Sequence, residues 1–469
     1  ERAWETRPSL AFIGRYSPYI QVNALVKPDL RPTLTPMISL AERRRIARLV
    51  HRFGFGPRPG EFSNLLAGGF NQAAEKYLSV ASQDAFADSQ DEPVVRDQGK
   101  RPAPNSPDVV SYATEKRAQL TSLSFWWLDR MVLSEHSLRE RMTWFWHGHW
   151  ATSYQKVDDA LPMYLQNQSL RRNALGNFAQ MSREMVNDAA LIFWLDGQTN
   201  TVKAPNENLS RELMELFTLG VNRYSEDDVK ETAKALTGYK VDKSSGQVNY
   251  YPKQHFTGSI KVLGTQGSFD ASSLSDFLVA RNDSALFITE RIWYRFISSM
   301  NPLTDTSLTA SFASRDIAAL VKAIGKHSAL DNPENSMVKS PIDWFISASR
   351  ALSITPSKFS NPNNIRNYLN LLGQLPFFPP NVGGWPADQA WLSTSSAQYR
   401  IQFATQLVKE ADLSPISSLA PKARIDGLAD WLGVVEWSSR TKMALTGAIN
   451  DPARLALLAL CSPEYVVSA

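Results

Sequence analysis

Residues 206–219 read NENLSRELMELFTL, and their apolar side chains recur with the period of an α-helix. Leu209, Leu213 and Leu216 are three or four positions apart, which places them on one side of a helix. Charged residues fill the positions between them, as expected for a helix with one face in the core. Gly220 follows the stretch directly. The pattern therefore predicts a helix with a polar outer face.

The same period recurs along most of the chain. Ser225 with Asp228 has the spacing of a capping box, and Ser340 followed by Pro341 has that of a helix start. Further helices are expected over residues 40–51, 61–66, 71–80, 111–133, 137–146, 161–182 with a break near Gly176, 188–195 and 226–236, and again from 274 to the C-terminus. We therefore expect a mainly α fold, with one multi-helical globular domain over residues 38–469.

Three segments depart from the helical pattern. Residues 1–37 are punctuated by prolines and show no helical period, so we expect an extended N-terminal arm. Residues 82–108 are polar with few large apolar groups, which favours a mobile loop. Residues 239–263 contain several glycines and the alternating run Val248-Asn249-Tyr250-Tyr251, which predicts one small β-hairpin insertion.

The composition limits the classes of protein to which the chain can belong. Of 469 residues, 43% are hydrophobic and 20% are charged, as in a packed globular protein. A formal net charge of +4 and the lack of a long basic block predict no nucleic-acid partner. No apolar run approaches the roughly 20 residues of a membrane helix, so we expect a soluble protein without a membrane span. The single cysteine, Cys461, excludes an internal disulfide and a zinc site made of thiolates.

The chain is rich in aromatic residues, and several surround a pair of histidines. Residues 144–153 read WFWHGHWATS, so that Gly148 separates His147 from His149. On a helix, side chains two positions apart point to different sides, whereas in an extended segment they share a face and can bind one metal ion. Neutral imidazole suits zinc, so a divalent metal on His147 and His149 is one interpretation. The alternative is that both rings form hydrogen bonds within an aromatic core.

A second group of polar residues lies on the helix predicted over residues 206–219. Glu207 and Arg211 are four positions apart and can pair on one side of the helix. A carboxylate group held by Arg211 can perform acid–base chemistry or bind a cation, but the same spacing also produces an ordinary solvated face. The candidate catalytic residues are His147, His149, Asn206, Glu207, Arg211 and Glu212.

Two other segments supply candidate binding residues. His255 lies in the glycine-bearing region of the predicted hairpin, where a histidine suits a site, although a lone exposed histidine is the commoner outcome. Residues 377–386 read FFPPNVGGWP and contain Asn381 and Trp385. This rigid aromatic segment suits stacking on a sugar ring or a partner, and it equally suits a buried turn that fills the core.

Several catalytic signatures are absent from the sequence. It contains no GxxxxGKS/T phosphate loop, no GxGxxG after a strand, no HExxH and no GxSxG. Nucleotide hydrolysis, zinc proteolysis of the HExxH type and α/β-hydrolase chemistry therefore lack support. We expect no nucleotide cofactor, and the divalent metal remains an open alternative.

Four segments together resemble the bacterial domain-of-unknown-function eighteen-hundred family. They are HRFGFGP at residues 51–57, FWHGHWATS at 145–153, PNEN through RELMELFTLG at 205–220, and PPNVGGWP at 379–386. The resemblance covers about residues 38–465 in the expected order. It implies a bacterial protein, often exported and often encoded beside a second exported protein, with no established activity. Members usually carry an acid after the histidine that matches His255, whereas Phe256 stands here.

Two functions remain open at this point. One is an exported enzyme that acts on an envelope or extracellular polymer through a His/Glu/Arg site, with or without a metal ion. The other is a non-catalytic binding or assembly protein whose polar residues are structural and whose partner is a second exported protein or a glycan. The resemblance implies a periplasmic or extracellular location, and the start at Glu1 instead of Met fits a removed export signal.

Overall fold

Apolar residues at helical spacing and capping side chains at helix starts organise the computed structural model, which describes residues 38–81 and 83–468. In α1 (Leu40–Gly54), Leu49 and Phe53 are buried, and the hydroxyl of Ser39 accepts the N–H of Glu42. The capping box of Ser225 with Asp228 forms as predicted. The prediction of a mainly α fold is confirmed.

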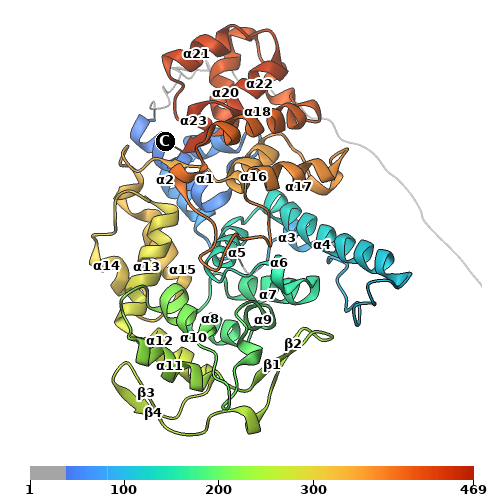
Figure 1. Cartoon of the computed structure of the whole chain (residues 1–469). Helices are drawn as coiled ribbons and strands as arrows, with labels where there is room; N and C mark the ends of the chain where they lie inside the picture. The colour runs from blue at the N-terminus through green and yellow to red at the C-terminus, as the bar shows by residue number, and fades with distance from the viewer. Residues whose placement is uncertain (1–37, 82, 469) are drawn as a thin grey trace, which may run out of the picture. The chain divides into compact units, whose positions relative to one another are not determined.

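Twenty-three α-helices lie within the described residues (Figure 1). They are α1 (Leu40–Gly54), α2 (Glu61–Tyr77), α3 (Ala85–Asp88), α4 (Asp108–Leu133), α5 (Leu138–His149), α6 (Tyr154–Val157), α7 (Ala160–Asn173), α8 (Phe178–Val186), α9 (Ala189–Trp194), α10 (Asn208–Glu212), α11 (Glu226–Ala235), α12 (Ala271–Ala280), α13 (Asn282–Phe296), α14 (Thr306–Ser311), α15 (Ile317–Lys326), α16 (Pro341–Ala351), α17 (Pro362–Leu371), α18 (Thr394–Lys409), α19 (Ser414–Ser417), α20 (Arg424–Leu432), α21 (Ser439–Thr446), α22 (Pro452–Leu460) and α23 (Pro463–Val466). None of the helices in this part of the chain is long and apolar enough to span a membrane.

Three antiparallel pairs of strands complete the described secondary structure. They are β1 (Tyr239–Asp242) with β2 (Gln247–Tyr250), β3 (Ile260–Val262) with β4 (Thr265–Gly267), and β5 (Met337–Val338) with β6 (Val467–Ser468). The hairpin predicted within residues 239–263 is β1–β2, so this prediction is confirmed. The structure contains a second hairpin, β3–β4, which the sequence did not predict. Its turn places Leu263 at φ 50°, a backbone conformation that leucine rarely adopts, so the sequence gives no sign of the turn.

Breaks in the helices fall where glycine permits them. The two helices expected over residues 61–66 and 71–80 form α2, whose helical backbone is interrupted at Gly69 (φ 75°, ψ 175°). The break expected near Gly176 separates α7 from α8. The helix expected over residues 206–219 is the α10 segment followed directly by a π-helix, η2 (Leu213–Thr218). Such π-helical turns are rare and occur frequently at functional sites.

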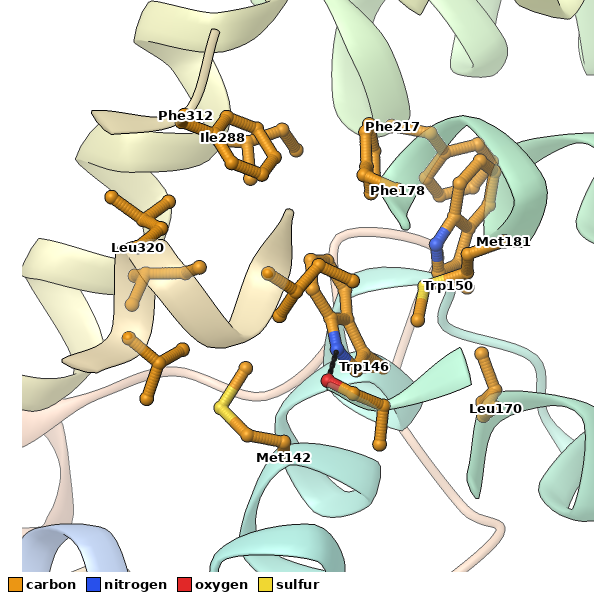
Figure 2. Close-up of a cluster of buried hydrophobic side chains, with 14 of the residues drawn as sticks. Met142, Trp146, Trp150, Leu170, Phe178, Met181, Phe217, Ile288, Phe312 and Leu320 are labelled. Carbon is orange, nitrogen blue, oxygen red and sulfur yellow. Dashed lines mark hydrogen bonds between the residues drawn. The ribbon is translucent and has the colours of Figure 1, made fainter. Parts of the chain in front are cut away.

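Two hydrophobic clusters form the core, and helix α5 contributes to both. Met142 and Trp146 belong to the first cluster, whereas Trp144 belongs to the second. Figure 2 shows the first cluster, in which Trp146 donates its indole N–H to the carbonyl of Ala174 at 3.0 Å. Phe178 stacks on the ring of Trp146 with centroids 5.5 Å apart. Helix α5 is therefore the element on which the two halves of the core meet.

The first half of α5 carries a fully enclosed carboxylate. Glu140 is 2% exposed and accepts hydrogen bonds from Arg130 at 3.0 Å, from Arg171 at 2.7 Å and from the indole of Trp127 at 3.1 Å. Burial disfavours the ionised carboxylate, but the two guanidinium groups outweigh it and lower the pKa of Glu140 to about 2. This ionic cluster joins α4, α5 and α7.

The expected N-terminal arm, residues 1–37, lies outside the described residues. From Ile38 onward the chain forms one compact unit. In the described part of the polar segment 82–108, α3 is tied to α4 by the ion pair of Asp88 with Arg130 at 2.6 Å. Val94 also donates its N–H to the hydroxyl of Ser122 at 3.1 Å. The mobility of this segment stays a prediction.

The end of the chain returns to its first helix (Figure 1). Arg52 of α1 donates to the hydroxyl and the carbonyl of Ser468 in β6, at 3.1 and 2.9 Å. Its other terminal nitrogen donates to the carbonyl of Ile297 at 2.8 Å. Arg52 also donates to the carbonyl of Asn335 at 2.6 Å. One buried guanidinium thus satisfies backbone groups from three distant segments, which is how the HRFGFGP motif contributes to the fold.

Candidate functional site

His147 and His149 both lie in the last turn of α5, and their rings enter different clusters. The ring of His147 contacts Trp127 and Phe377, with centroid distances of 5.1 and 5.3 Å. The ring of His149 contacts Trp146 and Trp150, at 5.4 and 5.6 Å. Because the segment is helical, the two imidazoles do not share a face. The two rings therefore do not lie side by side, as they would have to in order to bind one metal ion together.

His147 acts as a hydrogen-bond acceptor in the second cluster. Its ring is fully buried, and Nε2 accepts the N–H of Phe377 at 3.2 Å. The acceptor role of Nε2 places the ring proton on Nδ1, which is buried without a hydrogen-bond partner among the described residues. Burial lowers the pKa of His147 to about 3, so the ring is neutral at physiological pH.

His149 has the opposite role in the first cluster. Its Nε2 lies 2.9 Å from the carbonyl oxygen of Phe217, and because a carbonyl only accepts, Nε2 carries the proton. Burial, aided by the positive charge of Arg291, lowers the pKa of His149 to about 3. The two histidines are therefore neutral rings of opposite tautomer, each holding a backbone group of a distant motif.

The FFPPNVGGWP segment packs directly on α5. Gly384 has φ 79°, and a Cβ atom there would lie only 2.2 Å from the carbonyl oxygen of Gly148. Trp385 is 4% exposed and stacks on Trp144, with centroids 4.9 Å apart and planes 25° apart. Glycine at position 384 therefore permits close backbone approach, and Trp385 fills the core. Asn381 is exposed, and its side-chain oxygen accepts the N–H of Gly383 at 2.9 Å.

A cavity of about 60 Å³ opens beside this seam between α5 and the segment 384–391. Its walls are formed by Arg141, Trp144, Phe145, Gly148, Arg295, Phe296, Met337, Val338, Ser340, Asp343, Gln374, Trp385, Ala387, Asp388 and Trp391. Sequence reasoning identified only Trp385 among these as a binding residue. The arginines have no local partners in the sequence, and their convergence from α5 and α13 is visible only in three dimensions.

Asn206 organises the start of the helix that follows it. Its N–H donates to Asn200 at 2.9 Å, its amide nitrogen donates to Thr199 at 3.0 Å, and its side-chain oxygen accepts the N–H of Asn208 at 2.9 Å. All of these contacts are local to the turn before α10. Asn206 therefore has a capping role in this structure.

Glu207 and Arg211 pair on the outer face of the helix, as their spacing predicts. The distance from Arg211 Nη2 to Glu207 Oε2 is 3.5 Å, and Arg211 also forms a two-pronged pair with Glu226 at 2.6 and 2.7 Å. These side chains are 33% to 66% exposed. The hydrogen bonds from Arg211 lower the pKa of Glu226. Ion pairs this exposed contribute little to stability.

Among the carboxylates of the 206–219 helix, Glu212 is the one whose pKa is raised. Partial burial, followed by the negative charge of Glu215, raises the pKa of Glu212. Glu215 accepts the phenolic hydroxyl of Tyr224, whose pKa is raised to about 12 by burial and by this bond. Across residues 38–81 and 83–468, no group of three or more His, Cys, Asp or Glu side chains is arranged to hold a metal ion.

Phe217 connects the histidine segment to the 206–220 segment: its carbonyl bonds to His149, and its ring packs on Trp150 with centroids 4.7 Å apart. Among the described residues, no hydrogen bond or ion pair links an imidazole of His147 or His149 to Glu207 or Glu212. The imidazoles lie inside the core, whereas Glu207 and Arg211 lie on its surface. These candidate catalytic residues therefore do not meet at one accessible site.

His255 lies apart from the other candidates, after the β1–β2 hairpin. It is partly buried, and its Nδ1 lies 2.9 Å from the carbonyl oxygen of Thr237. Its ring contacts Tyr250, with centroids 5.4 Å apart. Phe256 donates its N–H to the hydroxyl of Thr237 at 2.8 Å, so position 256 contributes a backbone contact to this turn.

The comparisons with known proteins identify a family and no activity. Among curated proteins and among solved structures, nothing matches the chain. The model of the family described as "Protein of unknown function (DUF1800)" matches residues 48–467. This match covers nearly the whole chain, as the four sequence motifs predict, and the chain belongs to this family.

Proposed function

We propose that the chain is a non-catalytic binding or assembly protein. In this proposal the imidazoles and the carboxylates of the motifs stabilise the fold, and a ligand is received at the cavity beside α5. One observation carries it: His147 and His149 are buried on different sides of one helix, each bound to the backbone of another motif. Groups so enclosed contact no substrate.

The stability argument follows from these contacts. Removal of the His147 ring leaves the N–H of Phe377 buried without its acceptor, which costs about 1–3 kcal/mol. The missing ring also leaves a cavity between Trp127 and Trp385, which adds to that cost. His149 has the equivalent position against Phe217. We therefore expect either substitution by alanine to lower the free energy of unfolding by about 2–4 kcal/mol.

Urea unfolding of His147→Ala and His149→Ala tests the proposal. His255→Ala is the matched control, because His255 is only partly buried, whereas His147 and His149 are 0% and 2% exposed. The control is expected to lose less than about 1 kcal/mol. A His147→Ala variant with the stability of the unchanged protein would refute the architectural role and with it the proposed function.

A second candidate function is an enzyme that acts on an envelope or extracellular polymer. The raised pKa of Glu212, which ends α10 directly before the π-helix η2 that contains Glu215, is the observation that favours it. Under this candidate, Glu212→Gln abolishes the function of the protein in its host while leaving its melting temperature unchanged. Retained function in that variant would exclude Glu212 as a catalytic acid or base.

We also propose a place and a partner for the protein, following what the sequence resemblance implies. We propose that it works in the periplasm or outside a bacterial cell, and that its ligand is carried by a glycan or by a second exported protein. Cell fractionation with an antibody against the chain tests the location. Recovery in the cytoplasmic fraction alone would overturn this part of the proposal.

A further inference from the structure

We infer that the cavity beside α5 binds a small oxyanion, a carboxylate or a phosphate group, between Arg141 and Arg295. The inference rests on the proposed function, since it names the chemistry of the group that the binding protein would receive. It depends on three features of the cavity: its size, its unused hydrogen-bond donors and its charge.

The size of the cavity fits a small polar group. About 10–15 Å³ is enough to hold one water molecule, so the observed 60 Å³ accommodates a group of a few heavy atoms. The cavity therefore suits a charged substituent of a larger molecule whose remainder stays outside, or a free small ion.

The walls present hydrogen-bond donors that the protein does not use. Arg141 donates from Nε to the carbonyl of Arg52 at 2.7 Å and from Nη1 to Asp343, and its Nη2 has no partner among the described residues. Arg295 donates from its two terminal nitrogens to the carbonyls of Trp385 and Pro386, which leaves its Nε free within the same set of residues.

Other donors at the cavity are also unused. Gln374 is 2% exposed; its side-chain oxygen accepts the N–H of Ile342 at 2.9 Å, and its amide nitrogen has no partner in the described part of the chain. The indole nitrogens of Trp385 and Trp391 are buried, and neither finds a hydrogen-bond acceptor there. An oxyanion in the cavity would supply acceptors to the free nitrogens of Arg141, Arg295 and Gln374, whereas the two indole nitrogens have no surface that a ligand could reach.

The acceptors of the cavity are already occupied. Asp343 receives Arg141 on one oxygen and the hydroxyl of Ser340 on the other, at 2.9 Å for the latter. Asp388 receives the N–H of Val338 at 2.8 Å and the hydroxyl of Ser299. The cavity has spare donors, and each carboxylate oxygen in its wall already accepts one hydrogen bond, which favours a ligand that accepts hydrogen bonds.

The charge of the cavity also favours an anion. Arg141 is balanced by Asp343, whereas Arg295 forms no ion pair with any described carboxylate. Burial, together with the nearby charge of Arg291, lowers the pKa of Arg295 to about 10, so its guanidinium stays protonated at neutral pH. The wall itself holds two arginines and two aspartates, Asp343 and Asp388. Asp388 acts on the guanidinium of Arg52, and Arg291 adds its charge near Arg295, so positive charges outnumber negative ones around the cavity. Trp144 and Phe296 form apolar parts of the wall, and an ion pair between Arg295 and an anion is stronger beside apolar groups than in water.

Gly148 offers a way to close the cavity without disturbing these contacts. A Cβ atom at position 148 would meet only the ring of Trp385, at 3.9 Å, which is ordinary van der Waals contact. Alanine also favours the helix over glycine. Arg295→Gln is the more obvious variant, but it also removes two hydrogen bonds that hold the segment 385–386. Gly148→Ala is therefore the sharper test.

The experiment is a titration of the full chain, followed by tryptophan fluorescence, with sodium acetate in one arm and sodium phosphate in the other. Sodium chloride holds the ionic strength constant. We expect saturable binding of at least one oxyanion, and at least tenfold weaker binding by Gly148→Ala with a melting temperature that is unchanged or higher. Gly447→Ala is the control, since a Cβ atom there meets nothing closer than 3.5 Å and the residue does not line this cavity. It should bind like the unchanged protein.

The two arms decide between sources of the anion. Saturation by acetate alone indicates a carboxylate ligand, and saturation by phosphate alone indicates a phosphate ester. No saturable binding in either arm, or equal binding by Gly148→Ala, would overturn the inference. That result would leave the proposed function standing if His147→Ala is destabilised, whereas a stable His147→Ala variant would refute the proposed function without affecting the anion titration.

Discussion

Glu140 and Arg211 are each the centre of a three-charge cluster, and the two clusters differ in burial. Glu140 lies between Arg130 and Arg171 and is 2% exposed, whereas Arg211 lies between Glu207 and Glu226 on the surface. The sequence displays the exposed pair of Glu207 and Arg211 at helical spacing. The buried cluster cannot be recognised in the sequence, because the partners of Glu140 lie 10 and 31 residues away from it. The cluster that is easiest to find in the sequence is therefore the one that contributes least to the fold.

The largest effect should follow a change in the buried cluster. Glu140→Gln leaves two guanidinium groups enclosed without their carboxylate, and we expect a loss of about 3–5 kcal/mol in the free energy of unfolding. Denaturant unfolding followed by circular dichroism measures it. A loss below about 1 kcal/mol would mean that water reaches this cluster and that the contrast in burial has little energetic meaning.

Acid should destabilise the protein through the two buried histidines. Their pKa values are lowered from 6.5 to about 3 on folding, so the unfolded chain binds protons first as the pH falls. Their contribution is complete above pH 6.5 and is lost progressively down to about pH 3. Each histidine should contribute a slope of about 1.4 kcal/mol per pH unit in this range. Unfolding at pH 7.5 and 5.5, compared between the unchanged protein and His147→Gln, isolates one of them. Equal pH dependence in both proteins would contradict the assigned burial.

The smallest effect is expected at the surface cluster. Glu226→Gln removes the partner of Arg211 at a position exposed to solvent, and we expect little or no loss in the free energy of unfolding, with any loss decreasing further in high salt. The same denaturant measurement at low and high ionic strength checks both statements. A loss comparable to that of Glu140→Gln would show that the surface cluster supports the fold after all.

The sequence predicted the helices because their period is local. The core face of the 206–219 helix, the break near Gly176 and the cap at Ser225 each depend on residues within a few positions of one another. The β5–β6 pair joins Met337 to Ser468, and no local pattern can display such a pairing. The same limit applies to the cavity, whose arginines come from α5 and α13.

The sequence also left the histidine pair open for a physical reason. Gly148 weakens a helix but does not forbid one, so the choice between a helical and an extended segment depended on packing. The close approach of Gly384 to the carbonyl of Gly148, together with the stacking of Trp385 on Trp144, decided it. The sequence shows that glycine and tryptophan residues are present at these positions, but it does not show that they contact α5.

Nitrogen-15 NMR of the histidine side chains tests the central claim most directly. The assignment of His147 and His149 uses their alanine variants, and spectra are recorded from pH 8 to pH 5. The claim predicts two neutral rings with the proton on Nδ1 of His147 and on Nε2 of His149, neither titrating across this range nor shifting when zinc is added. Titration of either ring near pH 6.5, or a joint shift of both with zinc, would contradict it.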